Sequence, residues 1–199
     1  MASTSAPFGF RPSFHNSGNI RPKAYTIASG YAANIFSGDP VKLATTGVIQ
    51  LATSDGTRTG TVDGIAMLGI FAGCEYKDST GKPTVSNFWP TGITATAITA
   101  YVYDDPETIF EVEYANPGTP GITSVQVDVG GECDWVQTAA GGSTSTGLSA
   151  TKLTALQSTS GQFQITGFSK DVSQDLTDAY VVATVRINEH HYKASVNTI

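Results

Sequence analysis

Short runs of alternating apolar and polar residues, each bounded by turn-forming residues, limit most strongly what this chain can fold into. Residues 108–114 alternate strictly, so an extended chain places Phe, Val and Tyr side chains on one face and glutamates on the other. Runs 41–43 and 48–51 flank a Thr-Gly turn, which is typical of a β-hairpin. We find no pattern that predicts a long helix. The pattern predicts an all-β fold, a β-barrel or sandwich of short antiparallel strands.

The sequence divides into four expected parts. Residues 1–23 are expected to form an extended N-terminal arm, because its three prolines remove backbone donors and block helix formation. Residues 24–115 are expected to form a β-barrel body, and residues 116–187 a second β subdomain or annex. Residues 188–199 lack a strong periodicity and are expected to form a C-terminal tail. A chain of 199 residues is long enough to bury a core.

Several local predictions depend on composition. Residues 64–72 are the most apolar and are predicted to form the most buried strand, and 125–129 another short strand. Residues 137–147 are rich in Gly, Ser, Thr and Ala, which predicts a loop that is mobile unless a partner packs on it. Residues 148–156 fit either a helical turn or a strand.

Three aromatic residues stand out in the arm. Phe8, Phe10 and Phe14 lie in an otherwise polar segment. Exposed aromatic rings on a free tail favour unwanted association, so we expect these rings to insert into a groove. The groove could belong to the same chain or to a neighbouring subunit, and we favour the neighbour.

Charge is unevenly distributed along the chain. The net charge is −6, yet the only charged residues before Asp39 are Arg11, Arg21 and Lys23. A short basic arm ahead of an acidic body predicts that the arm docks on an acidic surface, the alternative being scattered cations on a floppy terminus. The acidic body has too few cations to bind nucleic acid through its phosphates.

The two cysteines and the apolar content indicate where the chain is made. Cys74 and Cys133 do not form a C-x-x-C motif, and the N-terminus lacks the features of a secretory signal. The longest apolar stretch, 65–72, is too short to cross a bilayer. We therefore expect synthesis in a reducing cytoplasm, free thiols and no membrane partner, with a Cys74–Cys133 bridge left open.

Paired carboxylates are the first candidates for chemistry. Glu111 and Glu113 lie two apart on one strand face, a separation of roughly 7 Å that suits glycoside hydrolysis. That face is interpreted as the solvated side of an amphipathic strand. Asp104, Asp105 and Glu107 are also close in sequence, and the Asp-Pro step at 105 is interpreted as a turn.

Metal ligands and nucleophiles are the next candidates. His190 and His191 are adjacent, so they point to opposite faces of an extended chain. Asp128, Glu132 and Asp134 flank a Gly-Gly step and carry the oxygen ligands that calcium uses, without the spacing of a defined calcium loop. No G-x-S-x-G motif is present. We expect a protein that is not an enzyme, with no cofactor and no metal.

Carbohydrate binding is an alternative function. Lectin-like β-sandwich modules stack sugars on exposed aromatic rings, and Trp89, Trp135, Tyr76 and Tyr101 could serve. Aromatic residues of an all-β chain are more often core or interface residues, so this stays the second hypothesis.

Short aromatic and glycine-rich motifs are spread over more than half of the chain. The arm sequence Phe8-Gly9-Phe10-Arg11-Pro12 resembles the start of capsid-associated proteins of short-tailed phages. The block from Tyr31 through Tyr76 resembles the lambda-type decoration scaffold, a small β-barrel. It contains Ser37-Gly38-Asp39-Pro40-Val41-Lys42-Leu43, the turn at Gly47, Gly64-Ile65 and Gly69-Ile70-Phe71-Ala72-Gly73. The likeness to the short-tailed phage group continues in Ala100-Tyr101-Val102-Tyr103-Asp104-Asp105-Pro106 and Phe110-Glu111-Val112, and residues 116–199 show none.

Together these motifs resemble the head decoration proteins of tailed phages, and this resemblance implies a structural virion protein. It implies a cement protein that binds the outer capsid surface, staples adjacent subunits of the major capsid protein and forms a homo-oligomer, a dimer or trimer. Under this hypothesis the residues that bind the capsid partner are Phe8, Phe10, Arg11, Pro12, Phe14, Arg21 and Lys23. The alternative is a carbohydrate-binding or host-attachment module of the virion.

Overall fold

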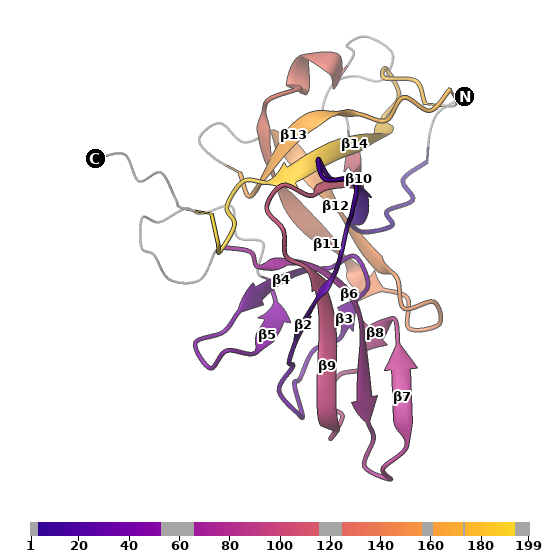
Figure 1. Ribbon diagram of the computed structural model, residues 1–199. Helices are drawn as coiled ribbons and strands as arrows, with labels where there is room; N and C mark the ends of the chain where they lie inside the picture. The colour runs from indigo at the N-terminus through magenta and orange to yellow at the C-terminus, as the bar shows by residue number, and fades with distance from the viewer. Residues whose placement is uncertain (1–3, 53–65, 116–124, 157–160, 173, 194–199) are drawn as a thin grey trace.

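Two β-modules lie one above the other in the computed structural model (Figure 1). The structure describes residues 4–52, 66–115, 125–156, 161–172 and 174–193. In these residues the regular structure consists of fourteen strands and a single 3-10 turn, η1 (Val125–Asp128). The all-β prediction is therefore confirmed.

The first barrel, the lower module in Figure 1, is a six-stranded sheet in which a path of five strands curls until its ends meet. Thr26 O accepts a hydrogen bond of 2.8 Å from Ile49 N, and Ile27 and Ile49 form a parallel bridge that closes the sheet. A further strand pairs with β6 outside this path, and a two-stranded sheet packs beside it. The strand order is β2 (Lys23–Tyr25), β9 (Thr96–Tyr103), β6 (Gly69–Lys77), β4 (Pro40–Leu43) and β5 (Ile49–Leu51), with β7 (Pro83–Ser86) on β6 and β3 (Ile35–Phe36) paired with β8 (Phe88–Trp89).

Strand β6 is the middle strand of the path around the first barrel, and its residues from Gly69 to Cys74 are apolar or small. Phe71 is fully buried, and a Cβ atom at Gly69 would collide with the backbone carbonyl of Tyr103 on β9. Only glycine allows the two strands to approach this closely. The strand begins at Gly69 and ends at Lys77, later than the predicted run 64–72, whose residues 64 and 65 lie outside the described residues.

The second barrel, the upper module, closes through a long antiparallel ladder. Strand β10 pairs with β14 along its whole length, and its other side touches β12 in parallel at Tyr114 and Leu153. The strand order is β10 (Ile109–Ala115), β12 (Ser149–Leu156), β11 (Glu132–Gly142), β13 (Phe163–Phe168) and β14 (Tyr180–Ile187), with β14 returning to β10.

The N-terminal arm occupies the side of the second barrel where β10 and β12 diverge. Strand β1 (Arg11–Phe14) pairs antiparallel with β10, and Gly9 N donates a 3.1 Å hydrogen bond to the carbonyl of Thr151 on β12. The arm thus supplies backbone partners to both strands, so it forms part of the barrel wall.

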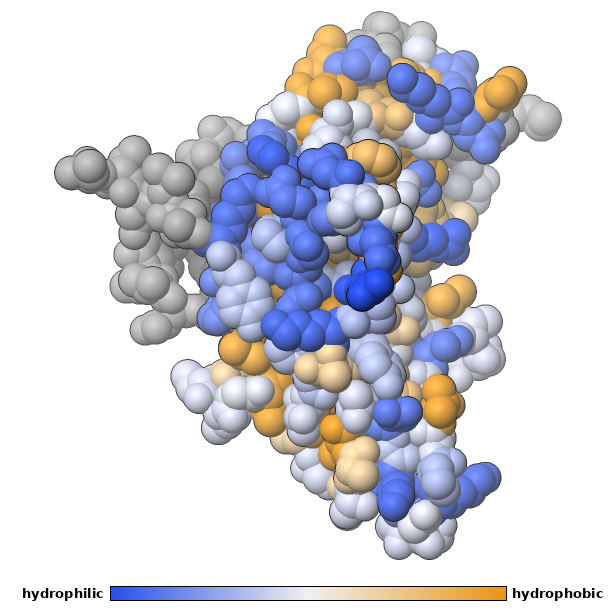
Figure 2. All heavy atoms as spheres, viewed as in Figure 1, coloured by the Kyte–Doolittle hydropathy of each residue, from blue (hydrophilic) through white to orange (hydrophobic). Residues whose placement is uncertain are grey.

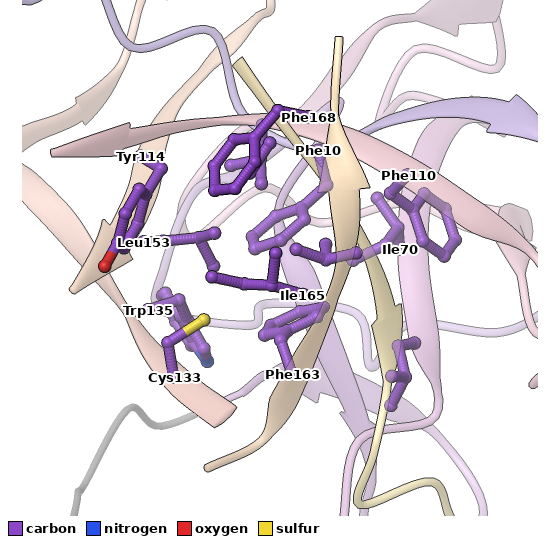
Figure 3. Close-up of a cluster of buried hydrophobic side chains, with 14 of the residues drawn as sticks. Phe10, Ile70, Phe110, Tyr114, Cys133, Trp135, Leu153, Phe163, Ile165 and Phe168 are labelled. Atoms are coloured by element: carbon purple, nitrogen blue, oxygen red, sulfur yellow. The ribbon is translucent and has the colours of Figure 1, made fainter. Parts of the chain in front are cut away.

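The core of the second barrel contains side chains from both modules (Figure 3). Phe10 of the arm is 2% exposed, and its ring stacks on that of Phe163 with 4.3 Å between centroids. Met67 and Ile70 come from the first barrel and belong to the same buried cluster. The two modules therefore share apolar contacts across their junction.

These arrangements correct several local predictions. Residues 24–115 were expected to form one barrel, and this is wrong because β10 (Ile109–Ala115) belongs to the second barrel. Residues 125–129 contain the 3-10 turn and no strand, and β11 runs into the segment 137–147 that was expected to be a loop. Residues 148–156 form strand β12, not a helical turn. In the predicted tail, the part up to residue 193 is described, and it reaches the first barrel through a parallel bridge to Met67.

Candidate functional site

The arm aromatics and basic residues have different surroundings. Phe10 is part of the chain's own core, so the expectation that it inserts into a neighbouring subunit is corrected: its apolar surface is already covered. Pro12 lies in β1 opposite Phe110, half-buried. The Arg11 guanidinium lies 4.3 Å from the centroid of the half-buried Phe8 ring. Phe14 is 53% exposed, and it is the arm aromatic that stays free to contact another molecule.

A buried glutamate holds the start of the arm. Glu113 is 5% exposed and accepts hydrogen bonds from the Ser5 hydroxyl at 2.7 Å and from Ala6 N at 2.6 Å. The Lys152 ammonium lies 3.9 Å away and supplies the opposite charge. Glu111 accepts a bond of 3.0 Å from the exposed Ser13 hydroxyl. The two glutamates were expected to share a solvated face, and this is wrong for Glu113 because the arm covers it.

An open hollow lies where the arm passes the turn between β9 and β10. Its volume is about 490 Å³, and its lining consists of His15, Ser17, Asn19, Ile20, Arg21, Asp104, Asp105 and Thr108. His15 pairs with Asp105 at 3.2 Å, and the Lys23 ammonium lies 3.4 Å from Asp104. Asp104 also accepts a 2.6 Å hydrogen bond from the Tyr25 hydroxyl. The acids of the hollow are thus already partnered, while Arg21 has no ion pair within the described part of the chain.

The adjacent histidines differ in burial, as expected for neighbours in an extended chain. His190 is 3% exposed and accepts a 3.1 Å hydrogen bond from Tyr192 N at its Nδ1 atom, whereas His191 is exposed. Burial lowers the pKa of His190, and the charge of Asp104 opposes this shift. The two imidazoles do not converge on one point.

The acids considered for calcium binding are engaged separately. Asp128 accepts a hydrogen bond of 2.9 Å from the Tyr114 hydroxyl, Glu132 one from Gly161 N at 2.9 Å, and Asp134 one from Gln162 N at 3.1 Å. Over the described residues, no three His, Cys, Asp or Glu side chains come together as metal ligands would.

The aromatic residues considered for sugar stacking are mostly inside the protein. Trp89 is 0% exposed, Trp135 is 3% exposed, and Tyr76 is also buried. Tyr101 is half-buried and donates a 2.8 Å hydrogen bond to Glu75. A buried indole cannot present its face to a sugar ring, so the residues proposed for carbohydrate binding do not form a platform.

A buried carboxylate joins the two barrels at their junction. Asp39 lies directly before β4 of the first barrel. It is fully buried and accepts a 2.8 Å hydrogen bond from Phe36 N. From the second barrel, the hydroxyls of Ser149 and Thr151 donate to the same carboxylate at 2.6 and 3.0 Å. Burial raises the pKa of Asp39, and these hydrogen bonds oppose the shift. The sequence around Asp39 gives no sign of these hydroxyl partners, which lie more than a hundred residues further along the chain.

Both cysteines are buried and unpaired. Cys74 belongs to the first core and Cys133 to the second, so the possible bridge between them is not formed. Burial raises the pKa of each thiol to about 12. Such thiols are poor nucleophiles near neutral pH.

The surface of the first barrel carries few charges. Apart from buried Asp39, from Lys42 and from Lys23 on β2, the charged residues of 23–52 and 66–103 lie on the β6–β7 hairpin, and these are Glu75, Lys77, Asp78 and Lys82. In Figure 2 the strongly hydrophilic surface is concentrated over the upper and middle part of the view, while much of the lower part is pale with apolar spots. Val85 on β7 is 82% exposed. Within the described residues β7 pairs with β6 alone, so its outer edge is open.

Comparison of the chain with protein-family models, with curated proteins and with solved structures finds no match. A search of the described residues for a helix long and apolar enough to cross a membrane likewise finds none.

Proposed function

We propose that this chain is a capsid cement protein, which binds the outer surface of a tailed-phage head and connects adjacent major capsid protein subunits. The observation that carries the proposal is the sparsely charged surface of the first barrel beside the open edge of β7. The motifs that resemble decoration proteins lie largely in this barrel.

A sparsely charged surface favours docking because few charged groups lose water when a partner covers it. Protein interfaces are depleted of charge at their centre for this reason. The open edge of β7 offers unpaired backbone groups to an extended segment of the capsid protein, and Val85 offers apolar area beside them. Exposed Phe14, at the end of β1 in the second barrel, and exposed Arg21, in the hollow beside the β9–β10 turn, supply a second contact.

A cement protein acts by binding two or more subunits at once. Packaged DNA pushes capsid subunits apart, and a protein that binds only the assembled arrangement stabilises it by mass action. Self-association into a dimer or trimer multiplies the contacts, so that modest individual affinities give firm attachment. The protein on this proposal is located on the outside of the virion.

The experiment is a binding measurement on emptied, expanded phage heads that lack this protein. The purified chain is expected to cosediment with the heads and to saturate at a fixed ratio to the capsid protein. Val85→Asp places a charge beside the open edge and is expected to weaken binding at least tenfold. Heads without the chain are expected to rupture at lower temperature than decorated heads.

A matched substitution elsewhere makes the result specific. Val172 is fully exposed in the second barrel, so Val172→Asp makes the same chemical change away from the docking edge. It should bind the heads as wild type does. Absence of saturable binding by the wild-type chain would reject the cement proposal, and equal binding by both variants would reject β7 as the docking edge.

A further inference from the structure

The hydroxyl and amide groups around Asp39 form an arrangement that the proposed function does not use. Gln137 on β11 lies directly opposite Thr151 on β12 in the strand register. Directly opposed residues point to the same face of a sheet, with Cβ atoms about 5 Å apart. The amide of Gln137 and the hydroxyl of Thr151 therefore face the same small space.

Asp39 contacts both groups. Its Oδ1 atom accepts the Thr151 hydroxyl at 3.0 Å, and each of its carboxylate oxygens lies 3.4 Å from Gln137 Nε2. The Ser149 hydroxyl lies 2.6 Å from Asp39 Oδ1 and 2.7 Å from Thr151 Oγ1. These contacts hold the Thr151 hydroxyl in position. One carboxylate thus reaches the oxygen that would attack and the nitrogen that would leave.

We propose that Thr151 and Gln137 become joined by an ester bond that the protein forms by itself, with Asp39 as the proton carrier. Thr151 Oγ1 attacks Cδ of Gln137 while Asp39 takes the hydroxyl proton. Asp39 then delivers that proton to Nε2 as the Cδ–Nε2 bond breaks, and ammonia leaves. The new bond is Oγ1–Cδ, one ammonia is the only product released, and no oxidant or other reactant takes part.

The surroundings favour this transfer in three ways. Thr151 is fully buried, so water competes poorly with its hydroxyl. The reacting groups are held on paired strands, which gives an intramolecular reaction a high effective concentration. Asp39 is a stronger base than a solvated aspartate, because its burial disfavours the charged form. Although an ester is less stable than an amide in water, the departing ammonia is diluted into solvent, which opposes reversal.

The intact mass of the purified, denatured full-length chain tests the proposal. The wild-type mass is expected to be lower than the sequence mass by one ammonia. Chymotrypsin cleaves after Leu148, which lies between the two residues, so the peptides that contain Gln137 and Thr151 should remain linked. Hydroxylamine cleaves esters, and it should separate the two peptides and leave a hydroxamate on Gln137.

Substitutions test which side chains form the bond. The wild-type mass is a second measurement, which does not require any variant to fold. Thr151→Val and Gln137→Leu are each expected to show their full sequence mass, and Asp39→Asn is expected to lose ammonia far more slowly. Thr154→Val, on the same strand, should keep the loss. A wild-type chain with its full sequence mass after prolonged incubation in the folded state overturns the proposal. So does an ammonia loss that persists in Thr151→Val or maps to another peptide.

Discussion

The ring of Phe10 lies nearly parallel to that of Phe163, at an interplanar angle of 13°. One ring comes from the N-terminal arm and the other from β13, so the contact joins two segments that lie far apart in the sequence inside one core. Phe10, which the sequence predicts to be an anchor for a neighbouring subunit, is therefore a structural residue of the second barrel.

Replacing Phe10 by alanine should destabilise the protein severely. The substitution leaves a ring-sized cavity against Phe163, and such changes cost about 3–5 kcal/mol. Phe14→Ala is the matched control, because this ring is largely exposed and its loss should change stability by no more than about 0.5 kcal/mol. Denaturant unfolding of both variants measures the difference. Equal stability of the two variants would show that the arm does not fill the core in solution.

The attachment of residues 4–8 should depend on Glu113. Glu113→Ala removes the acceptor for the Ser5 hydroxyl and Ala6 N, and the loss of a hydrogen-bonded charge costs about 1–3 kcal/mol. Hydrogen exchange at residues 5–9 is expected to become faster. Glu111→Ala changes the neighbouring acid, which contacts exposed Ser13, and should leave exchange there unchanged. Unaltered exchange in Glu113→Ala would contradict the assignment.

Acid should loosen the segment that contains His190. Because burial lowers the pKa of His190, the unfolded chain takes up its proton first as the pH falls below about 6.5. The stability contributed by neutral His190 is therefore present above that pH and is lost as the pH falls toward the lowered pKa. The free energy of unfolding should fall less between pH 7.5 and 5 in His190→Gln than in wild type. His191→Gln, an exposed neighbour, should keep the wild-type pH dependence.

Both thiols should be unreactive in the native protein. Buried thiols whose pKa is about 12 stay protonated at pH 8, so a thiol reagent should modify neither Cys74 nor Cys133 until the chain is unfolded. Titration with a chromogenic disulfide reagent, with and without denaturant, gives the counts. Rapid native labelling of either residue, or fewer than two thiols after unfolding without reductant, would contradict this arrangement.

Alternating runs and turn residues were sufficient to predict the fold class. The strict alternation of 108–114 forms β10, and the predicted hairpin around Gly47 forms β4 and β5. Residues 137–147 were misjudged because Gly, Ser and Thr suit a loop, while pairing with β12 holds the first part of that segment in β11. Pairing across the barrel outweighs local preference at such positions.

Which polar side chains are buried could not be predicted from the sequence. Glu111 and Glu113 have the same residue type and occupy the same strand face, and only the position of the arm makes one of them buried. Asp39 gained its role from hydroxyls on β12, a strand far along the chain. Such roles depend on long-range placement, which periodicity does not encode.

The pairing of Arg11 with Glu111 has a consequence for biosynthesis. The partner strand β10 is synthesised about 100 residues after β1, and β12, which flanks the arm on its other side, is synthesised later still. Contacts of such large sequence separation slow folding. We therefore expect nascent β1 to stay unpaired and accessible to chaperones until the last strands of the second barrel have been synthesised.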